Sequence, residues 1–348
     1  MAKIAIIAGD GIGIDVTAEA RKVLQEINRL ESLQIELVDF DFGADYFLKT
    51  GIALPEGQIE IFRNEFDAIL LGALGDPRIP DMAHGRGILL AMRFELDLFV
   101  NLRPVKLLHE KLCPLKNKTI RDVDFVVFRE NTEGEYVGAG GFLKKNTADE
   151  IAVQEAVHTR KGVERIIRAA FEYAVEHKRP KVTMSDKSNV LRYGHDLWQR
   201  VFYAVGEEYP KIEKEHFYVD AMLMEMIRRP EHFQVIVTEN MLGDIVTDVG
   251  AMLQGGLGMA ASGNIHPGQT SLFEPVHGSA PAMAGKNIAN PIAAILTAAM
   301  MLQHLNFASA AQRIENTVEA AILNHQVTQE LGGSLGTREV GDYISSRL

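Results

Sequence analysis

The chain alternates short apolar runs, rich in β-branched residues, with longer segments of helical periodicity. The run KIAIIAG at residues 3–9 is followed by a helical pattern from about Asp15 to Arg29. Further strand-like runs are IELVDFDFG (35–43), FDAILLGAL (66–74), VDFVVFRE (123–130), KVTMSDK (181–187) and FQVIVTEN (233–240). Strands that alternate with helices in this way predict an α/β fold with a substantially parallel sheet.

A length of 348 residues suits one large domain or two of ordinary size. No linker rich in Pro, Gly or Ser divides the sequence, so we expect any second domain to be inserted into the first. Residues 134–150 form a glycine-rich, polar segment, GEYVGAGGFLKKNTADE. This segment predicts a protruding loop or hairpin arm that could project toward a partner subunit.

Composition and charge exclude several classes of protein. The net charge of −11 argues against nucleic acid as a partner, because phosphate binding needs a basic surface. The single cysteine, Cys113, excludes an intrachain disulfide and a thiolate metal cage, and it favours a reducing cytoplasm. The longest strongly apolar run, 292–302, is too short to cross a bilayer and predicts a buried helix, so we expect no membrane association. The N-terminus lacks the features of a signal peptide.

Asp244 and Asp248 stand four residues apart in NMLGDIVTDVGAMLQGG. On a helix this spacing places both carboxylates on one face, where like charges repel each other by a few tenths of a kcal/mol. A divalent cation such as Mg²⁺ or Mn²⁺, which prefers oxygen ligands, would relieve that repulsion. The alternative is an acidic, solvated helix face, and spacing alone does not decide between the two.

Two segments suggest nucleotide binding. In GDGIG, at residues 9–13, Gly11 and Gly13 give the first part of a dinucleotide fingerprint, but Val16 stands where the third glycine is needed. A tight strand-to-helix turn is therefore the preferred interpretation. The segment EPVHGSAPAMAGKNIANP, at residues 274–291, is the better candidate. Its small residues let backbone N–H groups approach a pyrophosphate, and two polar side chains could face an adenine; these residues are Gly278, Ser279, Ala280, His277 and Asn290. The alternative is an ordinary loop.

Three arginines, Arg93, Arg103 and Arg129, fall at the ends of predicted elements. Converging guanidinium groups would bind a di- or tricarboxylate, and α/β ligands bind beyond the carboxyl ends of strands. Tyr136 and Lys187 are candidate acid–base groups. Taken singly, each of these residues is as readily a surface, ion-pair or structural residue.

Eight motifs, taken together and in order, resemble the β-decarboxylating dehydrogenases, which act on isopropylmalate, isocitrate, homoisocitrate and tartrate or D-malate. The motifs are GDGIG, NLRP, RENTEGEY, DKSNV, YVDAM, GDIVTD, EPVHGSAP and ANP. The resemblance implies a large cofactor-binding domain built from residues 1–98 and 254–348. It also implies an inserted smaller domain, 99–253, which carries substrate and metal residues and the dimer interface.

The same resemblance implies roles for single residues. Arg93, Arg103 and Arg129 would clamp the carboxylates of a small 2-hydroxy dicarboxylate substrate. Asp244 and Asp248 would bind Mg²⁺ or Mn²⁺ together with Asp220 from the other subunit of a homodimer. Lys187 would remove the proton of the C2 hydroxyl, and Tyr136 would protonate the carbon that loses CO₂. The residues expected to bind NAD are Glu274, His277, Gly278, Ser279, Ala280 and Asn290. Because these catalytic and metal residues are all present, the sequence argues against a relative that has lost catalysis.

The substrate-facing residues divide among the members of the family. Leu89 and Leu90 resemble the pair that packs on the isopropyl group of 3-isopropylmalate, and Asn189 and Val190 fit the same pattern. Against this, Arg86 stands where isopropylmalate enzymes often have a glutamate. The segments RENTEGEY, GDPRIPD and NTADEIAVQE resemble the tartrate/D-malate branch. We expect 3-isopropylmalate, with tartrate or D-malate as the alternative and homoisocitrate or isocitrate as more distant ones.

The cofactor loop departs from the family pattern at Ala282, where NAD-specific members usually carry an aspartate for the adenosine ribose. The Lys-Tyr pair of relatives that bind a 2′-phosphate is also absent, because Ala282 and Met283 occupy those positions. Since this loop supplies no cation for a 2′-phosphate, NAD is the expected cofactor.

Overall fold

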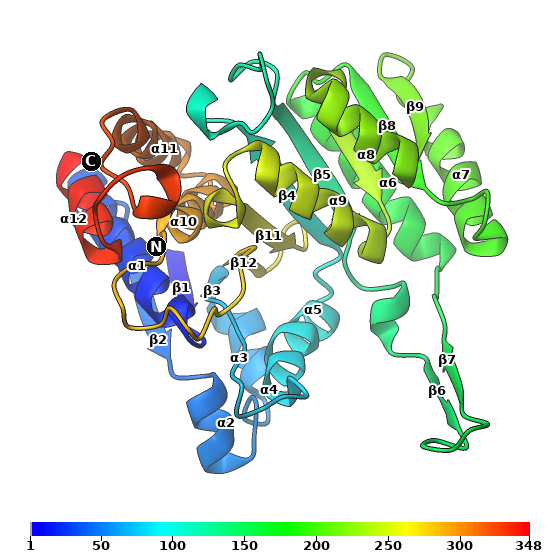
Figure 1. Cartoon of the computed structure of the whole chain (residues 1–348), viewed down its shortest axis with the longest axis horizontal. Helices are drawn as coiled ribbons and strands as arrows, with labels where there is room; N and C mark the ends of the chain where they lie inside the picture. The colour runs from blue at the N-terminus through cyan, green and yellow to red at the C-terminus, as the bar shows by residue number, and fades with distance from the viewer. Residues whose placement is uncertain (1) are drawn as a thin grey trace. The chain divides into compact units, whose positions relative to one another are not determined.

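The computed structural model describes residues 2–348, and the chain divides into two compact units (Figure 1). Unit 1 comprises Met1–Leu98, Leu107–Ile120 and Ala251–Leu348, and unit 2 comprises Phe99–Lys106 and Arg121–Gly250. Leu107–Ile120 falls inside the predicted smaller domain but groups with unit 1, where a Cβ added to Gly255 would lie 3.1 Å from the Leu112 side chain. The assignment of cofactor and substrate roles to two domains stays a prediction.

Unit 1 contains five strands in the order β2-β1-β3-β12-β11. Their bounds are β1 Ala2–Ile7, β2 Ile35–Phe40, β3 Ala68–Leu71, β11 Ala261–Ile265 and β12 Ser271–Pro275. Strand β1 pairs in parallel with β2 and β3, and β12 pairs in parallel with β3, whereas β11 and β12 are antiparallel. The predicted α/β fold is therefore confirmed, with one antiparallel strand in this unit.

The helices of unit 1 cover this sheet. Their bounds are α1 Ile12–Glu31, α2 Ala44–Thr50, α3 Gln58–Glu65, α4 Ala83–Gly85, α5 Ala91–Glu95, α10 Ile292–His304, α11 Ala308–Leu323 and α12 Thr337–Arg347. Helix α10 is apolar nearly all round and buried, and it packs on α1, α11, β11 and β12, as expected for a helix with no polar face. The short 3₁₀ segments are η2 Glu110–Leu112, η5 Leu257–Met259 and η6 Gln329–Leu331.

Besides the separate hairpin of β6 (Gly140–Leu143) and β7 (Ile151–Gln154), unit 2 contributes five sheet strands in the order β4-β5-β10-β8-β9. Their bounds are β4 Val100–Lys106, β5 Asp124–Glu130, β8 Lys181–Asp186, β9 Glu213–Tyr218 and β10 Val235–Thr238. Among these five strands the β4–β5 pair is antiparallel, whereas β10 pairs in parallel with β5 and β8, and β8 pairs in parallel with β9. The helices are α6 Arg160–Glu176, α7 Arg192–Gly206, α8 Val219–Arg228 and α9 Asn240–Leu253, and the 3₁₀ segments are η3 Glu135–Val137 and η4 Pro230–His232.

The expected protruding arm is a two-stranded hairpin of β6 (Gly140–Leu143) and β7 (Ile151–Gln154), which extends away from the rest of unit 2 (Figure 1). All eight strand residues are exposed, including Phe142, Leu143, Ile151 and Val153. A lone hairpin is marginally stable in water, so this arm has no core of its own. Among the helices of residues 2–348, none is both long and apolar enough to cross a membrane.

The GDGIG segment forms the tight turn between β1 and α1. Gly11 has φ 56°, and the Ile12 N–H donates to the Ser279 carbonyl oxygen at 2.8 Å. A Cβ built on Gly11 would lie 2.2 Å from that oxygen. The glycine is therefore required because the segment that carries His277 to Ala280 approaches the backbone here, and the turn binds protein rather than phosphate.

We predict that Gly11→Ala is more destabilising than Gly57→Ala. Both glycines have positive φ, but nothing lies within 4 Å of a Cβ on Gly57, so that control measures backbone strain alone. Strain of this kind costs roughly 1–2 kcal/mol. The clash at Gly11 adds to it, and we expect a total loss of about 3 kcal/mol in urea-induced unfolding. Equal losses for the two variants would show that the contact with Ser279 is not tight.

Candidate active site

Helix α9 carries both aspartates of the GDIVTD motif, one turn apart on one helix, as their spacing predicts. Glu239 stands directly before this helix and is 3% exposed. Its carboxylate accepts the N–H groups of Met241 at 2.8 Å and Leu242 at 2.7 Å. Two of the free N–H groups at the helix start are thereby satisfied, which fixes the first turn of α9.

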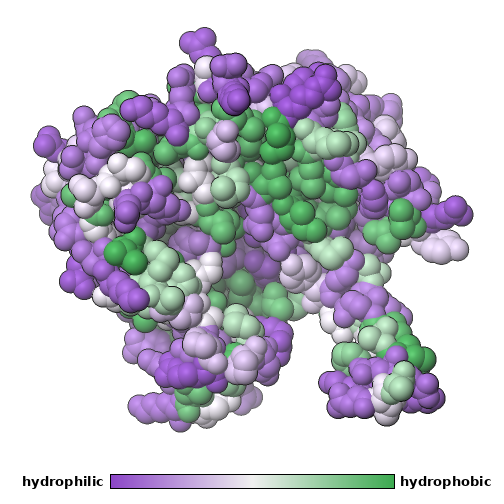
Figure 2. Space-filling view, in the orientation of Figure 1, coloured by the Kyte–Doolittle hydropathy of each residue, from purple (hydrophilic) through white to green (hydrophobic). Residues whose placement is uncertain are grey.

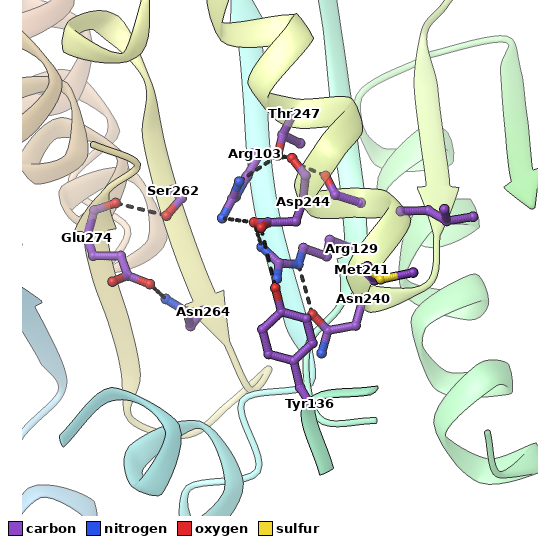
Figure 3. A network of polar contacts seen from close by, with 12 residues as sticks. Arg103, Arg129, Tyr136, Asn240, Met241, Asp244, Thr247, Ser262, Asn264 and Glu274 are labelled. Carbon is purple, nitrogen blue, oxygen red and sulfur yellow. Dashed lines mark hydrogen bonds and ion pairs between the residues drawn. The ribbon is translucent and has the colours of Figure 1, made fainter. Parts of the chain in front are cut away.

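Asp244 lies in that first part of α9 and meets the buried Arg129 at the carboxyl end of β5 (Figure 3). Arg129 Nη1 forms an ion pair with Asp244 Oδ1, and its Nε donates to Asn240 Oδ1 at 3.0 Å. The Tyr136 hydroxyl donates to Asp244 Oδ2 at 3.4 Å, and the Arg129 guanidinium lies 5.2 Å from the centre of the Tyr136 ring. The candidate proton donor Tyr136 and the candidate carboxylate-binding residue Arg129 therefore both contact Asp244.

Arg103 reaches the same aspartate from β4. In the antiparallel register Arg103 is opposite Val127, and Asn101 is opposite Arg129, so both arginines stand on one face of the strand pair. Arg103 Nη2 lies 3.4 Å from Asp244 Oδ1, and its Nη1 donates to Thr247 Oγ1 at 2.5 Å (Figure 3). Two of the three predicted carboxylate-binding arginines are thus brought together at Asp244.

Arg93 is held in unit 1 by a different carboxylate. It lies in α5, is 5% exposed, and its Nη2 donates to Glu274 Oε1 at 2.9 Å. Asn264 Nδ2 donates to the same oxygen at 2.9 Å (Figure 3). Arg93 Nε is buried and has no hydrogen-bond partner among the described residues, so a donor remains available there. The convergence of Arg93 with the other two arginines stays a prediction.

Lys187 and Asp220 form a second polar pair within unit 2. Strands β8 and β9 are parallel neighbours with Asp186 opposite Tyr218, so the residues that follow them emerge at the same edge. Lys187 Nζ lies 2.5 Å from Asp220 Oδ1, at the start of α8. This bond lowers the pKa of Asp220 from its ordinary value. The predicted base, Lys187, and one predicted metal ligand, Asp220, are therefore joined by an ion pair.

The predicted metal ligands of one chain do not form a complete metal site. Within residues 2–348, no group of three or more His, Cys, Asp or Glu side chains is placed to hold an ion. Asp244 and Asp248 supply two hard oxygen donors on one helix. Partial desolvation, and then the charge of Asp244, raise the pKa of Asp248, so the pair favours a nearby cation. These donors fit Mg²⁺ or Mn²⁺ as two of its ligands, with the others supplied by water, substrate or a second chain.

The predicted cofactor segment is an irregular loop that begins after β12. His277 Nδ1 donates to the Gly278 carbonyl oxygen at 3.1 Å, while its Nε2 is buried without a partner among the described residues. Burial lowers the pKa of His277, so the neutral imidazole is favoured. No atom lies within 4 Å of a Cβ on Gly278, and Asn290 Oδ1 accepts the Ile292 N–H at 3.1 Å, which caps α10. The unpartnered His277 Nε2 lies next to Gly278, whose backbone has free space around it, and both features fit a bound nucleotide.

A crevice of about 1030 Å³ lies in unit 1 at the carboxyl ends of β1, β2 and β3. Its charged lining is mainly acidic, consisting of Asp10, Asp15, Asp41, Asp45, Asp76, Lys49 and Arg78. Arg78 is already paired with Asp45 and Asp76, at 2.6 Å each. This crevice is therefore unfavourable for a pyrophosphate, which agrees with GDGIG being a structural turn.

The predicted substrate-selecting residues lie in two places. Leu89 and Leu90 are half-buried in a π-helical turn, Arg86–Leu90, between α4 and α5. Asn189 and Val190 are exposed in the turn after Lys187. Arg86 is exposed, and its Nη1 donates to the Asp81 carbonyl oxygen at 2.6 Å.

Sequence reasoning missed four contributors to these contacts. Asn240, Thr247 and Glu239 hold the arginines and the start of α9, and the π turn re-aims the helix that carries Leu89. A signal existed for Glu239 and Asn240, because a Glu-Asn pair at the start of a helical pattern is a typical N-terminal cap, but this signal does not include Thr247. No sequence pattern marked the π turn.

Comparison with known proteins identifies the family. Residues 3–344 match the isocitrate/isopropylmalate dehydrogenase family. The chain belongs to this family. It is therefore a dehydrogenase, an oxidoreductase, and the expected isopropylmalate dehydrogenase-like fold is confirmed.

Individual relatives of this family match over nearly the whole chain. The 3-isopropylmalate dehydrogenase of Thermobifida fusca is 46% identical over 348 residues, covering 99% of this chain and 97% of that protein. The 3-isopropylmalate dehydrogenase of Corynebacterium glutamicum is 48% identical over 349 residues, covering 99% of both. The crystal structure of isocitrate dehydrogenase from Methylococcus capsulatus is 36% identical and superposes with a TM-score of 0.89, covering 100% of this chain and 99% of that one.

We predict a pH-dependent stability from Glu239. Desolvation, opposed by the N–H groups of Leu242 and Met241, raises the pKa of Glu239 to about 7. A carboxyl group with a raised native pKa contributes stability that is complete below its unfolded pKa and is lost as the pH rises through about 7. The melting temperature of Glu239→Gln relative to the parent should therefore rise between pH 5 and 7 and then level off. A difference that stays constant over this range would contradict the assignment.

Proposed function

We propose that this protein catalyses the NAD- and divalent-metal-dependent oxidative decarboxylation of 3-isopropylmalate to 4-methyl-2-oxopentanoate and CO₂, a step of leucine biosynthesis. The observation that carries the proposal is identity of 46% and 48% to enzymes named 3-isopropylmalate dehydrogenase, over 99% of the chain. The single cysteine fits a reducing cytoplasm, where we place the enzyme.

Arg103 and Arg129 are the proposed partners of the substrate carboxylates, with Arg93 as the third. Their guanidinium groups are nearly fully buried, so each needs a counter-charge at close range. Asp244 fills that role in the free chain. A dicarboxylate bound beside Asp244 would take over part of this pairing, which leaves Asp244 freer to face a cation.

Two residues are positioned for proton transfer. Lys187 is the proposed base for the proton of the C2 hydroxyl, and its neighbour Asp220 holds the side chain in place. Tyr136 is the proposed acid that protonates the carbon from which CO₂ has left, and its hydroxyl is aimed by Asp244. When bound, NAD supplies the hydride acceptor and Mg²⁺ or Mn²⁺ supplies a Lewis acid toward the C2 oxygen.

The loop that contains His277 is the proposed site for NAD. The residues we assign to it are Glu274, His277, Gly278, Ser279, Ala280 and Asn290. The unpartnered His277 Nε2 supports this assignment, since a buried acceptor without a partner carries a cost of roughly 1–3 kcal/mol that a donor on the ligand would relieve.

Apolar side chains near the proposed substrate γ-group favour 3-isopropylmalate. Leu89 and Leu90 supply that surface, with Val190 and Asn189 as the second contact. Arg86 is engaged by Asp81 through Nη1 at 2.6 Å and Nη2 at 3.7 Å, so it is already occupied rather than held ready for an anionic γ-group.

A homodimer with shared active sites completes the proposal. Helices α8 and α9 expose Met224, Ile227, Met241, Ile245 and Met252, and Figure 2 shows a continuous hydrophobic area over these two helices. A surface of this kind favours burial against a second copy. Lys187 and Asp220 are joined to each other, whereas Asp244 and Asp248 form a separate pair, so we assign the two pairs of one active site to different chains.

Turnover of alternative substrates tests the reaction. We expect kcat/KM for 3-isopropylmalate to exceed that for D-malate and tartrate by about tenfold or more, because the extra apolar contact of the isopropyl group is worth roughly 1–3 kcal/mol. NADH formation should stop with a chelator and return with Mn²⁺. A tenfold preference for D-malate or tartrate would show that 3-isopropylmalate is not the substrate. No NADH formation with 3-isopropylmalate, D-malate or tartrate would overturn the proposed activity.

Mixing two inactive variants tests the shared site. Lys187→Ala and Asp248→Asn should each lose turnover by at least about a hundredfold, whereas Lys161→Ala, an exposed control on α6, should not. When the two inactive variants are dissociated and reassociated together, half of the dimers are mixed. Each mixed dimer holds one intact site, so activity should return to about a quarter of the parent value.

No recovery after mixing, with mixed dimers demonstrated by mass spectrometry, would place all of these residues of a site on one chain. A monomer by sedimentation at micromolar concentration would remove the shared-site proposal altogether.

A further inference from the structure

His195 makes an unusual contact with the backbone of Lys187. The imidazole is 1% exposed in the first turn of α7, and its Nδ1 accepts the Lys187 N–H at 2.7 Å. Lys187 is the first residue after β8, so its N–H lies just beyond the last strand residue of β8. The bond therefore fixes the point at which the Lys187 side chain leaves the sheet.

The surroundings of His195 hold it as a neutral acceptor. An imidazole nitrogen that accepts a hydrogen bond carries no proton, so the ring proton is on Nε2. His158 packs edge-on against His195, with ring centres 5.7 Å apart. His158 in turn accepts the Trp198 Nε1–H through its Nδ1 at 3.3 Å, which makes His158 neutral as well. Burial lowers the pKa of His195 to about 4, opposed by the charge of Asp186 and assisted by His158.

A second set of bonds holds the other side of the same turn. Asp186 is 1% exposed, and its Oδ1 accepts Ser188 N–H and Ser188 Oγ, each at 3.0 Å. The same oxygen lies 2.8 Å from His216 Nε2 on β9, four residues before Asp220. The turn at Lys187 is thus held in two ways. His195 accepts the Lys187 N–H, and Asp186 on one side of Lys187 accepts hydrogen bonds from Ser188 on the other.

We propose that His195 is a positioning residue for catalysis, which holds the Lys187 backbone through Nδ1 so that the lysine amino group stays beside Asp220, where it serves as the base. The inference rests on the proposed function of Lys187 as the base. It adds a residue that touches neither substrate nor cofactor and that acts only through Lys187.

The physical reason lies in the flexibility of lysine. Four methylene carbons separate Lys187 Nζ from the backbone, so a small rotation of the backbone moves Nζ much farther than it moves the backbone atoms. Proton transfer needs heavy atoms within about 3 Å, and a misplacement of about 1 Å can cost on the order of a hundredfold in rate. A fixed peptide plane at Lys187 removes one source of that displacement.

Replacement of His195 by asparagine and by leucine tests the proposal in a matched pair. The two side chains have similar size, but only asparagine places an acceptor atom where Nδ1 stands. We expect His195→Asn to keep kcat within about threefold of the parent. We expect His195→Leu to lower kcat by about tenfold to a hundredfold, with KM for the substrate nearly unchanged.

Hydrogen exchange at the Lys187 amide gives a readout that does not depend on activity. This amide should exchange at the parent rate in His195→Asn and much faster in His195→Leu, while amides of β8 exchange alike in both. If the leucine variant does not fold, His195→Gln replaces it, because glutamine carries the same amide group but displaces the acceptor beyond the Nδ1 position.

The outcomes separate this inference from the proposed function. Equal kcat values for the asparagine and leucine variants, or equal exchange rates at Lys187, would overturn the role of His195 while Lys187→Ala remains inactive. Full activity of Lys187→Ala would instead overturn the assignment of the base, and the role of His195 would fall with it.

Discussion

The pairing of two buried arginines with Asp244 is the interaction on which the candidate site depends. A guanidinium group removed from water is costly unless a carboxylate and further acceptors surround it. Arg129 satisfies this condition with Asp244 and Asn240, and Arg103 does so with Asp244 and Thr247. All three acceptors lie on α9, so the strand pair β4–β5 and this helix are fixed to each other by charge as well as by packing.

This arrangement is the proposed means by which an acidic protein binds an acidic substrate. The net charge of −11 repels dicarboxylates at long range, so binding must come from a local concentration of positive charge. In the proposed site, Arg103 from the middle of β4 and Arg129 near the end of β5 provide such a region before any ligand arrives, and because Asp244 already holds them, their side chains would lose little freedom when a ligand binds. The same aspartate accepts the Tyr136 hydroxyl, so in the proposed mechanism the anion-binding arginines and the proton donor share one partner.

Local patterns predicted the fold and much of the site, and long-range contacts account for the rest. The alternation of strand-like and helical runs gave the α/β architecture, and a four-residue spacing placed Asp244 and Asp248 on one helix. Motif order identified the family and led to Lys187 as the predicted base, and the contact of Lys187 with Asp220 spans 33 residues. Nothing local indicated that Asp10 would bind Ala44 N–H, Gly75 N–H and His84 Nε2, because these partners lie 34 to 74 residues away. The π turn at Leu89 was equally hidden, since its apolar residues also fit an ordinary α-helix.

The exposed hairpin of β6 and β7 affects how a single, unassembled chain resists proteolysis. Its apolar residues gain no burial within their own unit, so their ordering is linked by mass action to whatever covers them. If a second copy is that cover, dilution will loosen the hairpin before it affects the sheets, and the arm will then be the first segment that a protease cuts. Assembly would then set how long each newly made chain survives.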